Sequence, residues 1–258
     1  MSEVPISLSI AGPVATVAIN RPEVRNSLMR GMGGMICSVL REVAANPAIR
    51  VLVFRGVGSD FCAGADLKAT HGAGDADPPP DFDAYQVTVL LHEMPQVTIA
   101  AVRGACAGAG FGWACACDLR VTDDLARFNT AFLDVGVAGD MGVPWTLPRI
   151  VGSGCARDLM LRPRKLGAVE ALNIGLVEYL WPASEFEAEL EIMLDTLAGA
   201  APLALLGMKS NFVEAERVDL RSFMALEAER HIRLLKSADH AEATRAWLEK
   251  RPPKFEGR

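Results

Sequence analysis

The 258-residue chain carries 32 acidic and 26 basic residues, a formal net charge of -6, and half of its residues are hydrophobic. This composition predicts a globular chain with a substantial core, long enough for one large domain or one domain with an appendage. The acidic balance argues against a general nucleic-acid-binding or membrane-surface role and points to a small-molecule partner.

The start of the chain, MSEVPISLSIAG, lacks the basic and apolar regions of a secretory signal. Six cysteines without such a signal fit a reduced cytoplasm, which is the expected location. Their spacing and the four scattered histidines do not match a zinc site, so we expect no metal. The uncharged stretch Gly104 to Cys117 is shorter than the roughly 20 residues of a membrane span. It is expected to be a buried element.

The first predicted elements are a pair of strands followed by a helix. The runs ISLSIAG and VATVAIN, joined by a Gly-Pro turn, predict a β-hairpin. After them, Asn26 or Ser27 is expected to cap a helix that runs to about Ala45, before Pro47 ends it.

Two later runs, VLVFRG (51–56) and VTIAAVRG (97–104), are apolar and rich in β-branched residues, the pattern of strands buried on both faces. Each leads into a glycine-rich turn and then a helix-like segment. This repetition predicts an α/β fold with a largely parallel sheet.

The stretch HGAGDADPPP (71–80) is expected to be a mobile surface loop, either a plain linker or a lid beside a site. From about Val169 onward, helical periodicity dominates. We therefore divide the chain into a core domain at 1–200 and a C-terminal helical region at 201–258.

Two segments, FCAGADLK (61–68) and GACAGAGFGWACACD (104–118), share a design in which small residues follow a strand and precede a helix. Backbone N–H groups at such helix starts lack acceptors within the helix. Two such turns facing each other would form an oxyanion hole, in which each donor can contribute about 3 kcal/mol to the transition state. Either turn alone also fits ordinary turn chemistry, and neither matches a P-loop or dinucleotide motif.

Together these motifs resemble the crotonase family, also called the enoyl-CoA hydratase/isomerase family. The resemblance covers almost the whole chain and includes INRPEVRNSL, DFCAGADLK, AAVRGACAGAGFGWACACDLRV, VGVAGDMG, PRIVG and EALNIGLVEYLW. It implies the ClpP-like spiral fold of repeated β-β-α units, with a C-terminal helical trimerisation region. It also places the two polarising amides on Ala65 and Ala109.

The same resemblance implies an acyl-CoA thioester as substrate, with coenzyme A part of the substrate and no separate cofactor. Arg25 matches a basic position near the nucleotide, and the backbone around Cys62 and Ala63 matches the strip that receives adenine. Asp66 and Lys68 follow the first turn and are further candidates, although a helix-start acid and a solvated lysine are equally good interpretations.

The chain departs from the pattern of the family's hydratases, which use two glutamates to hold and shuttle a water. The matching positions here are Gly112 and Phe132. Without these acids, proton transfer loses groups that are each worth about 10²- to 10⁴-fold in rate. We expect little hydration of 2-enoyl-CoA, and restoring both glutamates should raise it only if the pocket tolerates the loss of Phe132.

Asp140, within VGVAGDMGVPWTLPR, is the remaining acid of interest. Its place resembles the aspartate of dienoyl-CoA isomerases and, still more, that of ring-epoxide isomerases, which also lack the glutamate pair. Burial among apolar groups would raise its pKa and help it to return a proton. The alternative is that Asp140 caps a short helix through Trp145. Asp134 is expected to be a solvated or loop-bonding acid.

Gly112, Trp113, Phe132 and Trp145 are candidates for the acyl pocket, and core packing fits each of the three aromatic residues equally well. The sequence thus predicts a double-bond or ring isomerase that uses Asp140 and the Ala65 and Ala109 amides. An atypical, weak enoyl-CoA hydratase of fatty acid β-oxidation and a non-catalytic acyl-CoA binding protein are the alternatives. A homotrimer or homohexamer is expected, because members of the resembled family trimerise and the last helices here carry apolar faces. The resemblance thus implies that the region at 201–258 serves oligomerisation and covers the site.

Overall fold

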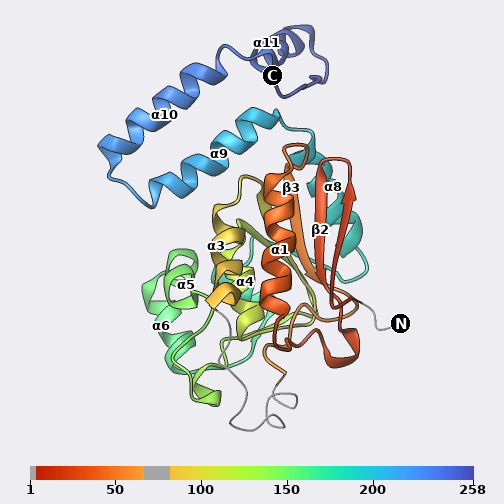
Figure 1. The fold of residues 1–258 in the computed structure, drawn as a ribbon, viewed down its shortest axis with the longest axis vertical. Coiled ribbons are helices and arrows are strands. Elements are labelled where there is room, and N and C mark those ends of the chain that lie inside the picture. Colours follow the sequence, from red (N-terminus) through yellow and green to blue (C-terminus); the bar gives the residue numbers. More distant parts are fainter. Residues whose placement is uncertain (1–3, 67–81) are drawn as a thin grey trace.

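The computed structural model describes residues 4–66 and 82–258 (Figure 1). Its centre is a six-stranded sheet in the order β1-β2-β3-β4-β6-β9. The hairpin strands β1 and β2 are antiparallel, and the other neighbouring strands are parallel. The largely parallel sheet of an α/β fold is therefore confirmed. The strands of this sheet are β1 (Ile6–Ala11), β2 (Val14–Ile19), β3 (Val51–Gly56), β4 (Val97–Val102), β6 (Leu119–Asp123) and β9 (Tyr179–Trp181).

The predicted hairpin and the two buried strands are confirmed. The hairpin pairs Ile6 with Ile19 and closes at Ala11 and Val14, and Gly12 between them has a positive φ of 57°. Five of the six residues of β3 and five of the six of β4 are buried. Both faces of these strands are covered, because helices pack on one side and α8 (Phe186–Ala198) packs on the other.

A small second sheet lies beside the large one, in the order β5-β7-β8. Its strands are β5 (Ala105–Ala107), β7 (Arg127–Asn129) and β8 (Leu166–Gly167). Because β5 follows β4 directly, the chain passes from the large sheet into the small one through Arg103 and Gly104. The second glycine-rich segment begins at this crossing.

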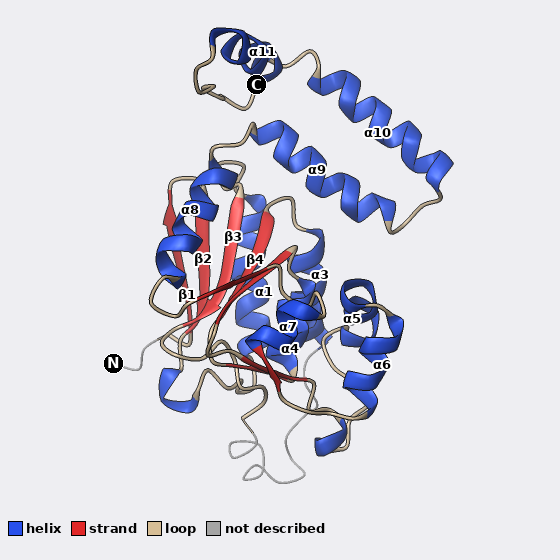
Figure 2. Cartoon of the chain, turned by 180° about the vertical axis from the view of Figure 1, so that it is seen from behind, coloured by secondary structure: helices blue, strands red, loops and turns tan. Residues whose placement is uncertain are grey.

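Helices cover the sheets and then continue beyond them (Figure 2). The short 3₁₀ helices are η1 (Pro22–Val24), η3 (Phe82–Tyr85) and η4 (Leu133–Val135). The remaining α-helices are α1 (Met32–Ala45), α3 (Gln86–Glu93), α4 (Ala109–Ala116), α5 (Val143–Val151), α6 (Ser153–Leu161), α7 (Ala168–Asn173), α9 (Pro202–Ala215), α10 (Leu220–Leu234) and α11 (Ala238–Glu249).

The predicted start of the first helix is wrong. Helix α1 begins at Met32, after Gly31 with φ 78°, and neither Asn26 nor Ser27 caps it. Asn26 has φ 56°, and its buried side chain accepts a hydrogen bond from the Arg21 amide and donates to the carbonyl of Val57. Tertiary bonds to the loop after β3 thus replace the local capping bond that the sequence suggests.

Helix α4 lies at the centre of the molecule, and all eight of its residues are buried. It contacts α3 on one side and α5 on the other. Because small residues dominate it, its backbone can approach its neighbours closely. Its first residue, Ala109, is one of the two predicted oxyanion donors.

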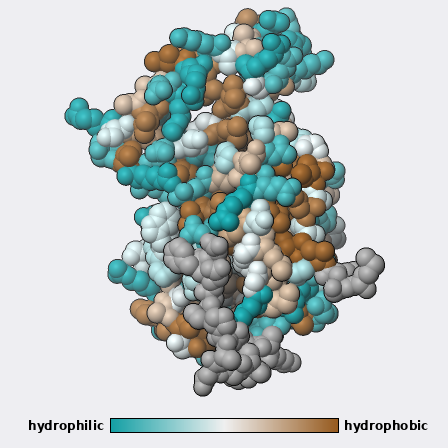
Figure 3. Space-filling model, viewed as in Figure 1, coloured by the Kyte–Doolittle hydropathy of each residue, from teal (hydrophilic) through white to brown (hydrophobic). Residues whose placement is uncertain are grey.

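Helices α10 and α11 extend away from the sheets (Figures 1 and 2), whereas α9 contacts β4 and α3. The helical periodicity expected for the last third is confirmed. No residue of α10 is buried, and hydrophobic side chains are visible among hydrophilic ones on this part of the surface (Figure 3). The most exposed large hydrophobic residues after residue 201 are Met208, Phe212, Leu220, Trp247 and Leu248.

Across residues 4–66 and 82–258, no single helix has the length and apolar character needed to cross a membrane. Helices α8 and α9 meet that test only as a pair, by length and composition, and they are bent by 100° at their junction.

Candidate active site

The two glycine-rich turns lie side by side. We call residues 61–66 the first turn and residues 104–110 the second turn. The Cys62 amide donates to the Ala105 carbonyl over 2.8 Å, and the Ala107 amide donates to the Cys62 carbonyl over 2.9 Å. These bonds form a parallel bridge between Cys62 and Cys106. The turns meet because they follow β3 and β4, which are parallel neighbours in the sheet.

Glycine is needed where the turns touch. Gly64 and Gly108 have φ values of 92° and 53°, which side-chain-bearing residues rarely adopt. A Cβ on Gly64 would lie 3.3 Å from the Ala107 carbonyl oxygen, and a Cβ on Gly108 would lie 3.6 Å from the Gly64 Cα. These two glycines therefore allow the backbones to pack directly against each other just before Ala65 and Ala109.

The amides of Ala65 and Ala109 have no acceptor within the part of the chain that the structure describes. The Leu28 amide donates to the Gly64 carbonyl, and the Asp66 amide donates to the Leu28 carbonyl. Because successive amides of an extended strand alternate in direction, the Ala65 amide points away from Leu28. Ala109 is the first residue of α4, where the amide lacks an intrahelical acceptor and the helix dipole favours negative charge. Among the described residues, neither amide is therefore committed to a protein acceptor.

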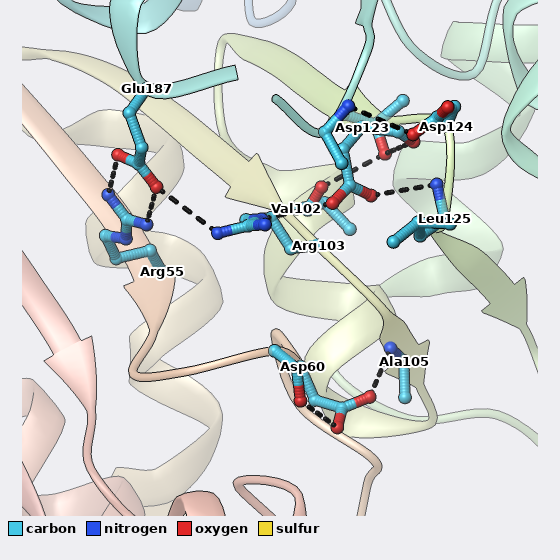
Figure 4. Close-up of polar contacts among 12 residues, drawn as sticks. Arg55, Asp60, Val102, Arg103, Ala105, Asp123, Asp124, Leu125 and Glu187 are labelled. Atoms are coloured by element: carbon cyan, nitrogen blue, oxygen red, sulfur yellow. Dashed lines mark hydrogen bonds and ion pairs between the residues drawn. The ribbon is translucent and has the colours of Figure 1, made fainter. Parts of the chain in front are cut away.

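Asp60 joins the two turns, and the sequence interpretation missed it. Its carboxylate accepts the Ala105 amide over 2.7 Å (Figure 4). Arg25 binds both carboxylate oxygens over 2.9 and 3.2 Å. Burial raises the pKa of Asp60, but Arg25 and the Ala105 amide together lower it below its usual value. The sequence signal that could have identified Asp60 is its position directly before Phe61 in the motif DFCAGADLK.

Four of the predicted coenzyme A residues come together around the first turn. Arg25 is 63% exposed at the rim, and its carbonyl accepts the Ala63 amide over 3.1 Å. Asp66 forms an ion pair of 3.3 Å with Arg21. Cys62, within the turn, is buried. Lys68 and the predicted loop at 71–80 lie outside the described residues.

The Cys62 side chain packs under the start of α4. A Cβ on Gly110 would lie 2.5 Å from the Cys62 Cβ and 2.8 Å from its sulfur. Burial raises the pKa of the Cys62 thiol to about 12, although the backbone amides of Gly64 and Gly110 partly oppose this effect. The thiol is therefore protonated at neutral pH, and its role is packing between the turns rather than nucleophilic chemistry.

Charged residues hold the strand ends behind the turns (Figure 4). Arg55 at the end of β3 binds Glu187 of α8 through two hydrogen bonds of 2.9 and 2.6 Å. Arg103, after β4, reaches Glu187 over 3.6 Å and Asp123 over 3.1 Å. The Arg103 carbonyl also accepts the Phe61 amide over 2.7 Å. This network fixes where the first turn leaves the sheet.

Asp140 is half-buried and does not cap helix α5. The helix begins at Val143 with Gly142 as its N-cap, so the capping interpretation is wrong. The side chain instead accepts the amide of the next residue, Met141, over 2.9 Å. Burial raises the pKa of Asp140, and the Met141 hydrogen bond lowers it by less, so that the pKa lies above its usual value. The carboxylate is thereby suited to accept and return a proton.

The positions of the missing acids are both apolar and buried. Gly112 lies in α4, where a Cβ would meet the Met141 Cβ at 2.6 Å. Phe132 is 4% exposed and belongs to the main hydrophobic core. A glutamate at position 112 therefore requires the segment after Asp140 to move.

The two tryptophans have different surroundings. Trp113 is buried, and its ring packs edge-on against Phe54 at 6.0 Å, which favours the core interpretation. Trp145 is 43% exposed, packs on His92 at 5.2 Å and lies under the Arg149 guanidinium at 3.7 Å. It lines a cavity of about 510 Å³ against α9 that includes none of the other predicted site residues. Trp145 is thus not placed with the two turns.

Among the described residues, no group of three or more histidine, cysteine, aspartate or glutamate side chains could hold a metal ion.

A protein-family model described as "Enoyl-CoA hydratase/isomerase" matches residues 9–258. The chain belongs to the enoyl-CoA hydratase/isomerase family. A protein from Rhodobacter capsulatus named "Probable enoyl-CoA hydratase" is 34% identical over 259 residues and covers the full length of both chains. The "1,2-epoxyphenylacetyl-CoA isomerase" of Escherichia coli is 32% identical over 254 residues, which are 95% of each chain.

Solved structures of the enoyl-CoA hydratase/isomerase family share this fold. The crystal structure of an enoyl-CoA hydratase from Bacillus anthracis superposes with a TM-score of 0.91 at 27% identity, and the match covers 99% of this chain and 100% of that one. The crotonase fold expected from the sequence is confirmed, and the chain is an enzyme of this family.

Proposed function

We propose that this enoyl-CoA hydratase/isomerase family member is an isomerase, which shifts a double bond or isomerises a ring in an enoyl-CoA thioester. The observation that carries the proposal is the half-buried Asp140 carboxylate with its raised pKa. It stands beside a helix whose Gly112 bears no acid, and Phe132 likewise replaces the second acid. The name of the Escherichia coli relative, an isomerase, supports the same choice.

In this mechanism, the thioester carbonyl oxygen accepts hydrogen bonds from the amides of Ala65 and Ala109. Asp140 removes a proton from a carbon of the acyl group, and the electron pair left behind is delocalised onto the carbonyl oxygen as a dienolate. The two amides stabilise that negative charge. Asp140 then returns the proton to a different carbon, so the double bond moves and no water is consumed. The carboxylate ends the cycle ionised, as it began.

The coenzyme A part of the substrate is assigned to the rim of the first turn. Arg25 is exposed there, and its guanidinium is held in place by Asp60, which supports an electrostatic role toward the phosphates. The backbone of Cys62 and Ala63 is assigned to the adenine strip on the family resemblance alone.

A homotrimer or homohexamer is the proposed assembly. In support of it, α10 has no buried residue, and apolar residues such as Ile232 and Trp247 are 54% and 79% exposed. A monomer would leave these faces in water, whereas a symmetric assembly would cover them. The division at residue 200 follows the same reasoning, since α9 begins at Pro202.

One experiment separates the three candidate functions. A panel of 2-enoyl- and 3-enoyl-CoA thioesters is incubated with the protein in deuterated water, and NMR follows both deuterium at the α and γ carbons and formation of 3-hydroxyacyl-CoA. Exchange without hydration supports the isomerase. Hydration as the main reaction would establish the hydratase, and binding without either reaction would establish an acyl-CoA binding protein.

A further inference from the structure

The absent side chain of Gly112 makes room for Met141. A Cβ on Gly112 would lie 2.6 Å from the Met141 Cβ, 3.1 Å from the Met141 carbonyl oxygen and 3.2 Å from a Val143 methyl group. The first of these separations is too short for two carbon atoms that are not bonded to each other. The segment after Asp140 therefore packs on bare helix backbone.

Met141 cannot easily give way, because it is held on several sides. It has φ 45°, an uncommon conformation for a residue with a side chain, and it lies between Asp140 and Gly142, whose φ is 73°. Its carbonyl accepts the hydroxyl of Thr88 from α3 over 3.1 Å. Its side chain is 8% exposed and packs in the main core.

Met141 also holds the carboxylate of Asp140, since its amide donates the 2.9 Å hydrogen bond to Oδ1. On the other side of the contact, Gly112 follows Ala109 by three residues, which is about 4.5 Å along the helix axis. A short chain of contacts therefore connects the proposed proton carrier to the proposed amide donor through Met141 and Gly112.

We propose that Gly112 is a positioning residue: because it bears no side chain, Met141 seats against α4 and fixes Asp140 at its working distance from the Ala109 amide. This inference rests on the proposed function. It differs from the idea that Gly112 merely lacks a catalytic group, because it requires that even a single methyl group at position 112 disturbs proton transfer.

A set of variants tests the contact with a matched control. Gly112→Ala adds one methyl group that collides with the Met141 Cβ. Met141→Gly removes that Cβ, whereas Met141→Ala keeps it, and both remove the rest of the buried side chain. The measured quantities are the rate of α and γ proton exchange, the acyl-CoA affinity and the melting temperature.

Gly112→Ala is expected to lower kcat for exchange by about 10²-fold, the scale of a 1 Å misplacement, while acyl-CoA affinity changes by less than about threefold. The double variant Gly112→Ala/Met141→Gly should recover to near the rate of Met141→Gly alone. Gly112→Ala/Met141→Ala should not recover. The melting temperatures should follow the same order as the exchange rates: lower in Gly112→Ala, recovered with Met141→Gly and not recovered with Met141→Ala. Helix propensity alone would instead make alanine at position 112 stabilising.

Two outcomes overturn the inference while leaving the isomerase intact: full exchange activity in Gly112→Ala, or equal recovery by the glycine and alanine variants of Met141. Absence of exchange in the wild-type protein on every enoyl-CoA tested instead refutes the proposed function. In that case the positioning role of Gly112 is refuted as well, and the melting temperatures show only whether Met141 packs tightly against Gly112.

Discussion

The backbone amide of Met141 donates a hydrogen bond of 2.9 Å to the Asp140 carboxylate, so the proposed proton carrier is held by its own neighbour in the chain. Such a bond stabilises the ionised form, but burial has the larger effect and the pKa of Asp140 is raised. A carboxylate that is fixed in place and easier to protonate than usual is what a proton shuttle needs.

The raised pKa of Asp140 predicts a pH dependence of the reaction. The carboxylate must be ionised to remove a proton, so the exchange rate should fall as the pH drops through the raised pKa. This acidic limb should lie above the ordinary value of 3.8. The pH profile of kcat/KM for α proton exchange measures it. A profile that stays flat down to pH 4 would contradict the assignment.

The same shift predicts an effect on stability. An acid whose pKa is higher in the folded chain than in the unfolded chain makes folding less favourable once the pH exceeds the unfolded value. Stability therefore decreases as the pH rises from about 3.8 through the folded pKa, and the loss persists at pH 7. Asp140→Asn removes this ionisation, so its melting temperature should exceed that of the wild type at pH 7. The difference in melting temperature between Asp140→Asn and the wild type should narrow toward pH 4. A difference that does not change with pH would argue against a raised pKa of Asp140.

Hydration of crotonyl-CoA should be very slow, because Gly112 and Phe132 supply no carboxylates for the water. The double variant Gly112→Glu/Phe132→Glu should not become an efficient hydratase, since a side chain at position 112 meets Met141. Loss of the enoyl thioester absorbance measures the rate, with an active hydratase as the positive control. A wild-type rate equal to that control would show that these two positions were assigned wrongly.

Thiol labelling checks the packing between the turns. Burial raises the pKa of Cys62 to about 12, so iodoacetamide should not modify it in the native protein. Cys155 is partly exposed and provides the internal control. Peptide mass spectrometry after brief labelling distinguishes the two residues. Equal modification of Cys62 and Cys155 would mean that the contact between the first turn and α4 opens readily.

The proposed assembly should be visible in solution. Light scattering at micromolar protein concentration should give three or six times the chain mass of 27.6 kDa. Trp247→Glu places a charge on a residue that is 79% exposed in the single chain and should weaken the assembly. A monomeric mass for the wild type would contradict the proposal.

Local sequence patterns predicted the elements that are determined by residues close together in the chain. Alternation and a Gly-Pro turn identified the β1–β2 hairpin, and continuous apolar runs identified β3 and β4. Their glycine-rich ends indicated two turns, because parallel neighbouring strands bring their carboxyl ends together. The assignment of the oxyanion donors to Ala65 and Ala109 came from the crotonase resemblance and stays a prediction.

What the sequence could not predict depends on contacts between distant residues. Asn26 has the right chemistry for a helix cap, but its side chain donates to the carbonyl of Val57, which lies 31 residues later in the chain. Asp140 also looks like a cap, yet Gly142 is the N-cap of α5, and the Asp140 carboxylate accepts the Met141 amide instead. The positive φ of Met141 and its contact with Gly112 have no local signature. Neither periodicity nor capping rules can predict that position 112 lacks a side chain because Met141 fills the space that the side chain would need.

The most direct test of the central claim is proton exchange by Asp140→Asn, compared with Asp134→Asn, which changes an exposed acid six residues earlier. Asparagine preserves the size of the side chain and removes its ability to carry a proton. We predict that Asp140→Asn lowers α and γ deuterium exchange in an enoyl-CoA by about 10²-fold or more, with acyl-CoA affinity nearly unchanged. Asp134→Asn should exchange at the wild-type rate. Full exchange activity in Asp140→Asn would contradict the assignment of Asp140 as the proton carrier.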